Sequence, residues 1–404
     1  MRPLKIGLIR ETKDPPDSRV AFPPAEAAAL LSRFPHLSLV VEPSEIRCFS
    51  DTSYREAGLT VTDQLDDCDL LIGIKEVKPE YLREGKSYLF FAHVAKEQPY
   101  NRELLKAILK KRVTLIDYEY LTDIHGVRLI AFGRWAGIVG AYNGLRLWGE
   151  RSGRYKLKPA HECHDWVEMQ QQLAGLDPGS VRILVTGGGR VARGAMETLS
   201  LIGATMLSPS DYLESEETGT LISRIDPWDY LARNDGREFD LVRFFEQPGN
   251  HHSRFKPYAR KTDLLITGHF WDPRSPRLWE PELMKSGEFR IGAIADISCD
   301  ILGSVPCTLR ATTIADPFYG YDPVKEIEVS SFTDPGVISM MTIDNLPGEL
   351  PRDASSEFAR VLGDSIIPLL GGEDQDGVIC RATIAHNGKL TERYAYLEGY
   401  LSGP

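Results

Sequence analysis

Short apolar runs alternate along the opening third of the chain with longer segments in which apolar residues recur every three or four positions. Runs of the first kind predict buried strands, and segments of the second kind predict amphipathic helices. Strands and helices that take turns typically form a parallel sheet covered by helices on both faces. The predicted strands are Lys5–Arg10, Leu37–Val41, Leu70–Ile74, Tyr88–Ala92 and Thr114–Tyr118, and the predicted helices are Pro24–Phe34 and Arg102–Lys111.

A second set of strand-length apolar runs begins near residue 181 and predicts a Rossmann-type sheet. The runs are Val181–Thr186, Ala204–Leu207, Leu264–Thr267 and Gly292–Asp296. Residues 211–260, which separate the second run from the third, are acidic and aromatic, and they are too many for a structureless loop in a compact domain. We therefore predict an insertion that contains helices, and an oligomer contact is one role open to it.

The end of the chain returns to the pattern of its beginning. After Asp344 the sequence predicts a helix at Ala354–Val361, a closing strand at Val378–Ala385 and a closing helix at Thr391–Tyr400. The first domain is then discontinuous: residues 1–135 and 345–404 form a substrate domain, and residues 136–344 form a dinucleotide-binding domain. The predicted fold class is α/β, with two Rossmann-like, doubly wound parallel-sheet domains.

The second domain contains a glycine-rich turn between a strand and a helix. Gly187, Gly188 and Gly189 follow a β-branched run, and the chain then resumes as a predicted helix that contains Ala, Met and Leu. Gly187 permits a tight exit from the strand, and Gly189 lets the backbone approach a pyrophosphate at the helix N-terminus. The third glycine, Gly194, departs from the commonest spacing, so a turn without a ligand is the alternative.

Small residues recur at helical spacing from Trp135 to Glu150. A glycine inside a helix costs about 1 kcal/mol relative to alanine, so several of them indicate close packing against another backbone. We expect this helix to bridge the two domains.

Composition narrows the class of partner. The chain has 404 residues and a formal net charge of −11, which argues against nucleic acid or an anionic membrane as the main partner. No apolar run is long enough to span a bilayer and no signal segment precedes the first strand, so the sequence predicts a cytoplasmic protein. The 6 cysteines are scattered without a C-x-x-C pair, which predicts reduced thiols.

Three polar residues lie at the ends or edges of apolar strands in the first domain, where α/β sheets bind ligands. Arg19 offers a planar fork for a carboxylate, Lys75 follows a buried run that would lower its pKa, and His93 is an acid–base group near neutrality. Each has a structural alternative. Arg19 would be a surface ion pair, Lys75 a solvated strand end, and His93 a hydrogen-bonded core side chain.

Polar residues also follow apolar runs in the second domain. Asp296 ends a strand where a nicotinamide ring and a substrate would meet, and Asp344 and Asn345 precede Leu346 and Pro347 after another apolar run. For Asp344 and Asn345, a helix cap or a turn is an equal alternative.

Asp211 follows Gly187 by about the interval expected of the acidic residue that binds the ribose hydroxyls of NAD. The sequence therefore favours NAD as the cofactor and leaves NADP open. The run of residues 161–164, His-Glu-Cys-His, has metal-ligand residue types, but its members are too crowded to converge on one ion. We predict a helix-entry turn there and no metal site.

Several of these residues belong to longer motifs. The motifs are Arg10-Glu11-Thr12-Lys13, Ser18-Arg19-Val20-Ala21, Gly73-Ile74-Lys75-Glu76, Phe91-Ala92-His93, Lys96-Glu97-Gln98, Phe132-Gly133-Arg134-Trp135-Ala136-Gly137, Ala295-Asp296-Ile297-Ser298 and the run from Ile343 to Ser355. In this order they resemble the superfamily of alanine dehydrogenase, transhydrogenase and saccharopine dehydrogenase, and most specifically its NAD-dependent, L-lysine-forming saccharopine dehydrogenase branch. The likeness spans nearly the whole chain.

The resemblance implies that cofactor and substrate bind in a cleft between the two domains. It makes Lys75 the general base and His93 the second acid–base group. It places Arg19, Gln98 and Arg134 at the substrate, with Arg134 near the cofactor as well. The implied dinucleotide-binding residues are Gly187, Gly188, Gly189, Arg190, Asp211, Asp296, Asp344, Asn345, Leu346 and Pro347.

The implied activity is that of an NAD(P)-dependent oxidoreductase acting on a CH–NH bond: oxidative cleavage of saccharopine to L-lysine and 2-oxoglutarate, or its reverse. Its partners are small amino acids and 2-oxo acids, and a homo-oligomer stays open. The nearest alternative is an alanine-type or opine dehydrogenase acting on another amine, and the alternative of another class is a non-catalytic nucleotide-binding regulator. His269 departs from the family's usual sequence, and it either alters substrate choice or is a turn histidine beside the cofactor pocket.

Overall fold

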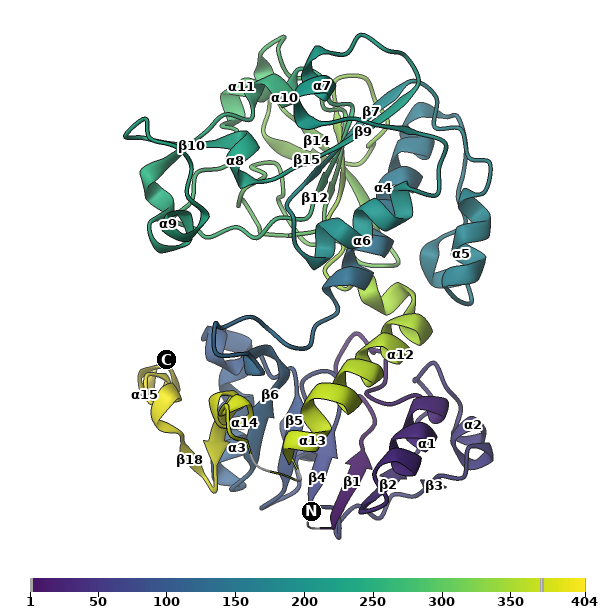
Figure 1. The fold of residues 1–404 in the computed structure, drawn as a ribbon, viewed down its shortest axis with the longest axis vertical. Coiled ribbons are helices and arrows are strands. Elements are labelled where there is room, and N and C mark those ends of the chain that lie inside the picture. The colour runs from purple at the N-terminus through teal and green to yellow at the C-terminus, as the bar shows by residue number, and fades with distance from the viewer. Residues whose placement is uncertain (1–2, 371, 373, 404) are drawn as a thin grey trace. The chain divides into compact units, whose positions relative to one another are not determined.

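The computed structural model describes residues 3–370, 372 and 374–403 (Figure 1). The chain forms two compact units, one of Met1–Phe132 with Pro351–Pro404 and one of Gly133–Leu350. We call the first the split unit and the second the continuous unit. Each contains an eight-stranded sheet, and the first is discontinuous in sequence. The predicted fold class of two Rossmann-like α/β domains, the first of them discontinuous, is confirmed.

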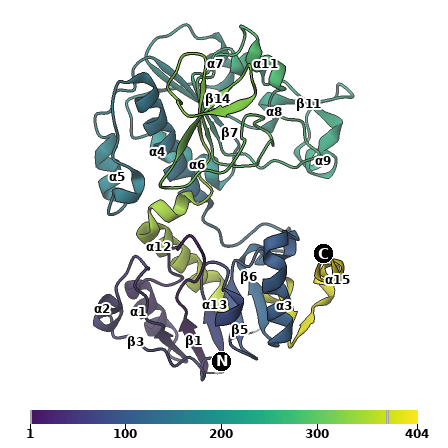
Figure 2. The same cartoon turned by 180° about the vertical axis from the view of Figure 1, so that it is seen from behind.

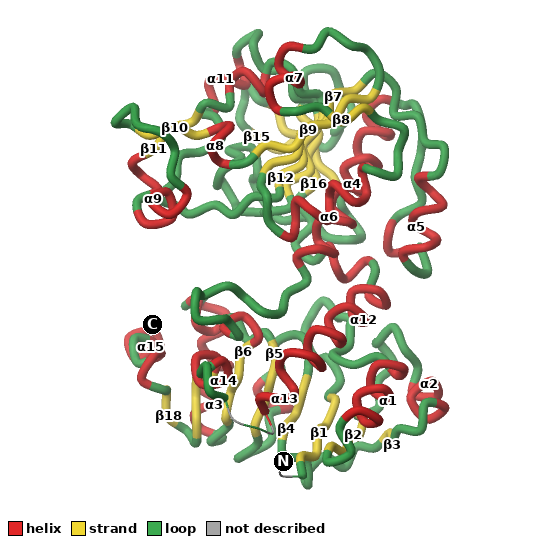
Figure 3. Tube along the Cα trace, viewed as in Figure 1, coloured by secondary structure: helices red, strands yellow, loops and turns green. Residues whose placement is uncertain are grey.

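The sheet of the split unit has the strand order β18-β17-β6-β5-β4-β1-β2-β3 (Figure 3). Strands β1 to β6 run parallel to their neighbours, while β17 and β18 pair antiparallel at one edge. The strands are β1 (Leu4–Leu8), β2 (Leu37–Val41), β3 (Thr60–Val61), β4 (Leu70–Ile72), β5 (Ser87–Phe90), β6 (Thr114–Asp117), β17 (Thr383–His386) and β18 (Lys389–Leu390).

Helices cover both faces of this sheet (Figures 1 and 2). Apolar side chains of α1, α12 and α14 pack with one face, and those of α3 and α15 pack with the other. The parallel core therefore has the two-sided helical cover that the alternating pattern predicts. The helices are α1 (Pro24–Arg33), α2 (Asp51–Glu56), α3 (Arg102–Lys110), α12 (Pro351–Val361), α13 (Ile367–Leu370), α14 (Val378–Ala382) and α15 (Leu397–Ser402).

The sheet of the continuous unit has the order β15-β14-β16-β13-β12-β7-β9-β8, with antiparallel pairing only at β14 and β15 among the described strands of this sheet. A separate antiparallel pair joins β10 to β11. The strands are β7 (Val181–Thr186), β8 (Thr205–Met206), β9 (Thr220–Ile225), β10 (Leu231–Arg233), β11 (His251–Ser253), β12 (Leu264–Thr267), β13 (Ala293–Asp296), β14 (Phe318–Asp322), β15 (Ile327–Val329) and β16 (Ile338–Met341).

Helix α4 packs on β12 and β13, while α7, α10 and α11 contribute to the apolar core on the other face. The helices of this unit are α4 (Gly133–Ser152), α5 (Trp166–Leu173), α6 (Arg190–Leu199), α7 (Pro209–Glu214), α8 (Pro227–Tyr230), α9 (Leu241–Glu246), α10 (Lys256–Ala259) and α11 (Pro281–Lys285). Within the described ranges, no helix combines the length and the apolar character needed to cross a membrane.

Two sequence expectations need correction. Residues 211–260 are not simply an insertion, because they supply β9, which lies in the main sheet between β7 and β8. Residues 378–385 are not one strand, because they form α14 and the start of β17. The sheets are also mixed at their edges, since β14, β15, β17 and β18 are antiparallel additions to parallel cores.

Helices α4 and α6 approach each other closely enough for their backbones to touch. A Cβ at Gly137 would collide with the backbone of Val191 and Ala195, and a Cβ at Gly194 would collide with the carbonyl group of Arg134. The close packing expected of the Trp135–Glu150 helix is therefore confirmed. It fixes α6, and with it the glycine turn that precedes α6.

We expect the substitution Gly137→Ala to lower stability by about 1–3 kcal/mol, because the added methyl group meets rigid backbone. Urea denaturation of the full chain measures the effect. Gly203→Ala is the matched control, since nothing lies within 4 Å of a Cβ built at Gly203. Equal stability of the two variants would contradict the backbone contact.

Candidate functional site

Charged side chains gather at the carboxyl edge of the parallel strands in the split unit. Glu11 follows β1, Lys75 follows β4 and His93 follows β5. Neighbouring parallel strands deliver the loops that follow them to the same edge of a sheet. The strand order β5-β4-β1 thus places these three loops next to one another.

Glu11 holds the loop that carries Lys75. Its two carboxylate oxygens accept hydrogen bonds from the backbone N–H groups of Ile74, at 2.6 Å, and Lys75, at 2.8 Å. Burial raises the pKa of Glu11 to about 8, although these two hydrogen bonds oppose that rise. Glu11 was missed as a site residue, although it stands in one of the motifs that carry the family resemblance.

Lys75 is a half-buried amine in a positively charged setting. Burial lowers its pKa from 10.5 to about 8, and the positive charges of Arg19 and Lys13 act in the same direction. The carboxylates of Asp17 and Glu76 oppose the shift. Lys75 is therefore half neutral at about pH 8, and the neutral amine is the state that a general base needs.

His93 is held by a carboxylate. Its Nδ1 lies 2.6 Å from Oε1 of Glu76, and Lys13 approaches the other oxygen of Glu76 at 3.5 Å. The backbone of His93 is left-handed, with φ at 54°. Burial by itself would raise the pKa of Glu76, but the hydrogen bond to His93 and the charges of His93 and Lys13 lower it to about 2. Glu76 is thus a fixed negative partner for the imidazole.

Arg19 lies inside the split unit with its guanidinium group bound to Asp17. Nε donates to Oδ1 of Asp17 at 2.9 Å, and a second nitrogen donates to Oδ2 at 2.6 Å. The guanidinium carbon also lies 4.3 Å from the ring centroid of Phe132. Arg19 is only 2% exposed, so the structure does not show it presenting a fork to a substrate. It does place a buried positive charge near Lys75.

The other two predicted substrate residues lie elsewhere. Gln98 is exposed in the loop after β5, and its backbone carbonyl oxygen accepts a hydrogen bond from the Tyr400 hydroxyl. Arg134 belongs to the continuous unit, at the start of α4, where it forms a bidentate pair with Glu197 of α6 at 2.9 and 2.5 Å. Their roles toward a substrate stay predictions.

The glycine turn joins β7 to α6. Gly187 has φ at +96°, in the left-handed region, and a Cβ there would lie 2.8 Å from the Cα of His269. Gly189 caps α6 without a side-chain hydrogen bond, and a Cβ built there would point into open space. The turn therefore has the tight exit, the uncapped helix N-terminus and the clear approach that a pyrophosphate requires.

Asp226, which the sequence analysis missed, lies where a ribose-binding acid is expected. It follows β9, the strand adjacent to β7, and its Oδ1 accepts a hydrogen bond from Arg224 at 2.9 Å. A Cβ at Gly188 would collide with Asp226. Asp211 instead lies in α7 after the edge strand β8, where its carboxylate accepts a hydrogen bond from the Ser208 hydroxyl at 2.6 Å.

Asp211 was chosen by its interval from Gly187, and it follows the second predicted strand of this domain, which corresponds to β8; this choice takes β8 to be the neighbour of β7. That assumption is wrong, because β9 lies between them. The signal that marks Asp226 is the interrupted apolar group of Leu221, Ile222 and Ile225, which ends directly before this acidic residue.

Asp296 is buried at the carboxyl edge of the sheet in the continuous unit, where it binds hydroxyl groups of neighbouring segments. Its oxygens accept hydrogen bonds from the hydroxyls of Thr267 at 2.5 Å, Ser298 at 2.6 Å and Thr308 at 2.5 Å. The residue is 0% exposed. This arrangement suits a positioning role and disagrees with the direct cofactor contact expected of Asp296.

The segment 344–347 follows β16 at the same edge of the sheet. Asp344 is exposed, whereas Leu346 and Pro347 are buried. A Cβ at Gly140 of α4 would lie 3.2 Å from Leu346. Leu346 thus anchors this segment on α4.

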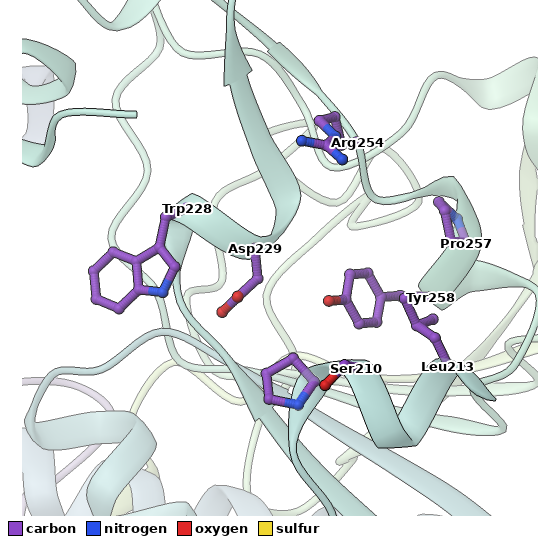
Figure 4. Close-up of a pocket in the computed structure, with 8 residues that line it drawn as sticks. Ser210, Leu213, Trp228, Asp229, Arg254, Pro257 and Tyr258 are labelled. Carbon is purple, nitrogen blue, oxygen red and sulfur yellow. The ribbon is translucent and has the colours of Figure 1, made fainter. Parts of the chain in front are cut away.

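A pocket of about 640 Å³ lies beside the loop that carries Asp226 (Figure 4). Trp228 and Asp229 of α8 lie on one side, and Leu213 of α7 and Tyr258 of α10 lie on the other (Figure 4). Asp229 also accepts a hydrogen bond from the backbone N–H of Asp226 at 2.8 Å. The pocket combines aromatic and polar walls next to the candidate ribose ligand.

The run of residues 161–164 does not gather around a single point. His161 faces Glu349 at 3.6 Å, while His164 faces Asp165 at 3.2 Å. Across the described part of the chain, no three His, Cys, Asp or Glu side chains are placed to hold a metal ion.

Comparison with known proteins identifies the class. Residues 7–139 match the family model of the alanine dehydrogenase/PNT N-terminal domain, so the chain carries that domain. The whole chain also has the fold of L-alanine dehydrogenase (18% identity, TM-score 0.67, covering 98% of this chain and 99% of that one). A transhydrogenase from Sinorhizobium meliloti shares it too (17% identity, TM-score 0.58, covering 96% and 98%).

Two groups of relatives resemble the chain in sequence more closely than these solved structures do. Alpha-aminoadipic semialdehyde synthase of Mus musculus is 31% identical over 89% of this chain, and that of Arabidopsis thaliana is 30% identical over 97%. The chain spans only 44% and 41% of these two proteins. The saccharopine dehydrogenase [NAD(+), L-lysine-forming] of Yarrowia lipolytica is 26% identical, over 91% of this chain and 92% of that protein. The resemblance to saccharopine dehydrogenases is confirmed.

We expect Glu76→Gln to destabilise the folded chain at pH 7 by about 1–3 kcal/mol, because a charged hydrogen bond to His93 is lost. A depressed carboxyl pKa stabilises the folded state above its ordinary value of 4.5, and that stabilisation is lost as the pH falls toward about 2. The difference between variant and parent should therefore shrink over this range. Urea denaturation at several pH values measures it.

Glu80→Gln, at an exposed carboxylate in the same loop, is the matched control and should show no such pH-dependent difference. A Glu76→Gln effect that is independent of pH would contradict the proposed pairing.

Proposed function

We propose that this chain is an oxidoreductase that interconverts saccharopine with L-lysine and 2-oxoglutarate, using NAD. The observation that carries the proposal is Lys75, a partly buried amine with its pKa lowered to about 8, next to the His93–Glu76 pair. The names of the relatives in Yarrowia lipolytica and other fungi support the choice of substrate and cofactor.

Neutral Lys75 accepts the proton of the substrate's secondary amine. Arg19, buried and tied to Asp17, keeps the ammonium form of Lys75 from being too stable, because like charges repel. Glu11 fixes the loop through two backbone hydrogen bonds, so that Lys75 starts from one defined position. Proton transfer by a positioned base contributes about 10²–10⁴ in rate.

His93 transfers protons during addition of water to the imine and release of the amine. Glu76 orients the ring through Nδ1, and Nε2 is then the nitrogen that exchanges protons. The balanced reaction consumes saccharopine, NAD⁺ and water, and it yields L-lysine, 2-oxoglutarate, NADH and a proton.

The residues of the continuous unit fit a dinucleotide. Gly187 and Gly189 form the turn for its pyrophosphate, Asp226 lies where the ribose hydroxyls would bind, and the pocket beside Trp228 has room for the adenine ring. A dinucleotide held by these residues would supply a hydride acceptor for oxidation of the carbon that bears the amine. Asp344, Asn345 and Arg190 stay predicted contacts of the same ligand.

NAD is preferred over NADP because a 2′-phosphate would meet the carboxylate of Asp226. Arg224 would have to leave Asp226 in order to pair with that phosphate. The reaction of an alanine dehydrogenase is the second candidate, since L-alanine dehydrogenase shares the fold.

The decisive experiment follows NADH absorbance with 2-oxoglutarate and a panel of amines that includes lysine, ornithine and ammonia. We expect consumption of NADH that depends on lysine, and slower consumption of NADPH. Pyruvate with ammonia is the parallel assay for the alanine reaction. Turnover of pyruvate and ammonia without any lysine-dependent turnover would replace the saccharopine proposal.

We expect Lys75→Met to lower kcat by about 10²–10⁴ while NADH binding is unchanged, because the base acts on the substrate proton. In the oxidative direction, the parent enzyme should gain activity as the pH rises through about 8, the pKa of Lys75. That limb of the pH profile should be absent from the variant's residual activity. Lys78→Met, at a lysine that pairs with Asp14, is the control. Full activity of Lys75→Met would remove the assignment.

A further inference from the structure

His269 lies at the start of the loop after β12, against the glycine turn. The Cα of His269 lies 2.8 Å from where a Cβ at Gly187 would be, so the two backbones touch. The residue is 8% exposed, and its ring centroid lies 5.9 Å from that of Tyr230. No step of the proposed reaction uses this histidine.

One nitrogen of the His269 ring is paired and the other is not. Nδ1 lies 2.6 Å from the hydroxyl of Thr186, the last residue of β7. Nε2 is buried and has no hydrogen-bond partner among the described residues. Most buried polar atoms in proteins have a partner, so an orphaned ring nitrogen points to a partner that the chain does not supply.

The surrounding hydrogen bonds indicate which nitrogen carries the proton. The Thr186 hydroxyl accepts a long hydrogen bond from the backbone N–H of Gly268, at 3.4 Å. The proton of the Thr186 hydroxyl can then be donated to Nδ1 of His269, which lies within hydrogen-bond distance. If Thr186 donates to Nδ1, the proton of a neutral imidazole lies on Nε2. Burial lowers the pKa of His269 well below 6.5, so the ring is neutral at pH 7.

The unpaired Nε2–H is therefore a donor, and it belongs to a residue whose backbone touches the glycine turn at Gly187. Gly189 caps α6 without a side chain, which leaves the first N–H groups of that helix directed at the turn. A buried donor without an acceptor is unfavourable, because it has lost its hydrogen bond to water without gaining another. N–H donors at a helix N-terminus are suited to an anion with several oxygens. The charge of Asp296 also acts on His269, where it opposes the lowering of the pKa by burial.

We propose that Nε2–H of His269 donates a hydrogen bond to the pyrophosphate of the bound dinucleotide, and that Thr186 is a positioning residue that fixes this tautomer. The proposal rests on the dinucleotide-binding function proposed above. It gives a role to a residue that departs from the family's usual sequence.

The test measures binding to the full chain without substrate, by titration calorimetry with NADH and with ADP-ribose, which lacks the nicotinamide. His269→Phe keeps a ring and removes the donor, and we expect it to weaken both ligands by about tenfold to a hundredfold. His269→Gln can present an amide N–H at a position similar to Nε2 and should recover most of the affinity.

Thr186 provides a second, milder pair of variants. Thr186→Val keeps the shape of the side chain and removes the hydroxyl, so it should weaken both ligands, whereas Thr186→Ser should bind like the parent. This pair decides the question if His269→Phe does not fold, which a thermal melt without ligand reveals.

The outcomes separate this inference from the function it rests on. If the parent chain binds neither NADH nor NADPH, the dinucleotide function itself is wrong. If the parent binds and the His269→Phe and Thr186→Val variants bind equally well, the His269 contact is wrong. A loss confined to NADH, with ADP-ribose unaffected, would also overturn it, because the contact would then be to the nicotinamide half.

Discussion

Parallel pairing is the constraint on which both candidate sites depend. A parallel strand can be followed by another only after a crossover, so each strand of the two parallel cores sends the loop after it to the same edge. In the split unit this places Glu11, Lys75 and His93 together, although they are far apart in sequence. In the continuous unit it does the same for Gly187, Asp226 and His269. Neither set could be assembled from hairpins.

Two pairs of hydrogen-bonded side chains lie near Lys75. Asp17 binds Arg19, and Glu76 binds His93. Glu11 has its carboxylate satisfied by backbone N–H groups instead of by a cation. Burying charges is costly unless they are paired. The pairing keeps the charges of Asp17, Arg19 and Glu76 fixed near Lys75. Lys75 and Glu11, each with a pKa of about 8, titrate near neutral pH.

Local sequence patterns predicted the strands of the two parallel cores except β3, β9 and β16. The bounds of β2, β7 and β12 coincide with the predicted runs Leu37–Val41, Val181–Thr186 and Leu264–Thr267. β9 was missed because Ser223 and Arg224 interrupt its apolar pattern, and the structure accommodates Ser223 by a hydrogen bond to the carbonyl of Leu207. The neighbour of a strand in a sheet is set by long-range pairing, which a local pattern does not encode.

The features of the candidate sites likewise fall into those that the local sequence predicts and those that depend on distant residues. The glycine turn could be predicted because its strand, turn and helix are consecutive. The setting of Lys75 could not, because Glu11, which holds its backbone, lies 64 residues earlier. Asp296 looked like a ligand at a strand end, yet hydroxyls from Thr267, Ser298 and Thr308 surround it. Whether a polar residue at a strand end binds a ligand or other residues of the protein therefore depends on residues that are distant in the sequence.

The split of the first unit has a consequence for the order in which the protein is made. Strands β17 and β18 complete the sheet that contains β1, and helices α12 and α14 cover one of its faces. All four elements are translated after the whole of Gly133–Leu350. Domains generally fold as units during synthesis. The continuous unit thus leaves the ribosome with all of its strands. The strands of Met1–Phe132 emerge earlier, but their unit cannot be completed until the segment after Leu350 has been synthesised. Until Pro351 onward is synthesised, the sheet edge at β6 and the apolar face that α12 covers stay open to solvent and to chaperones.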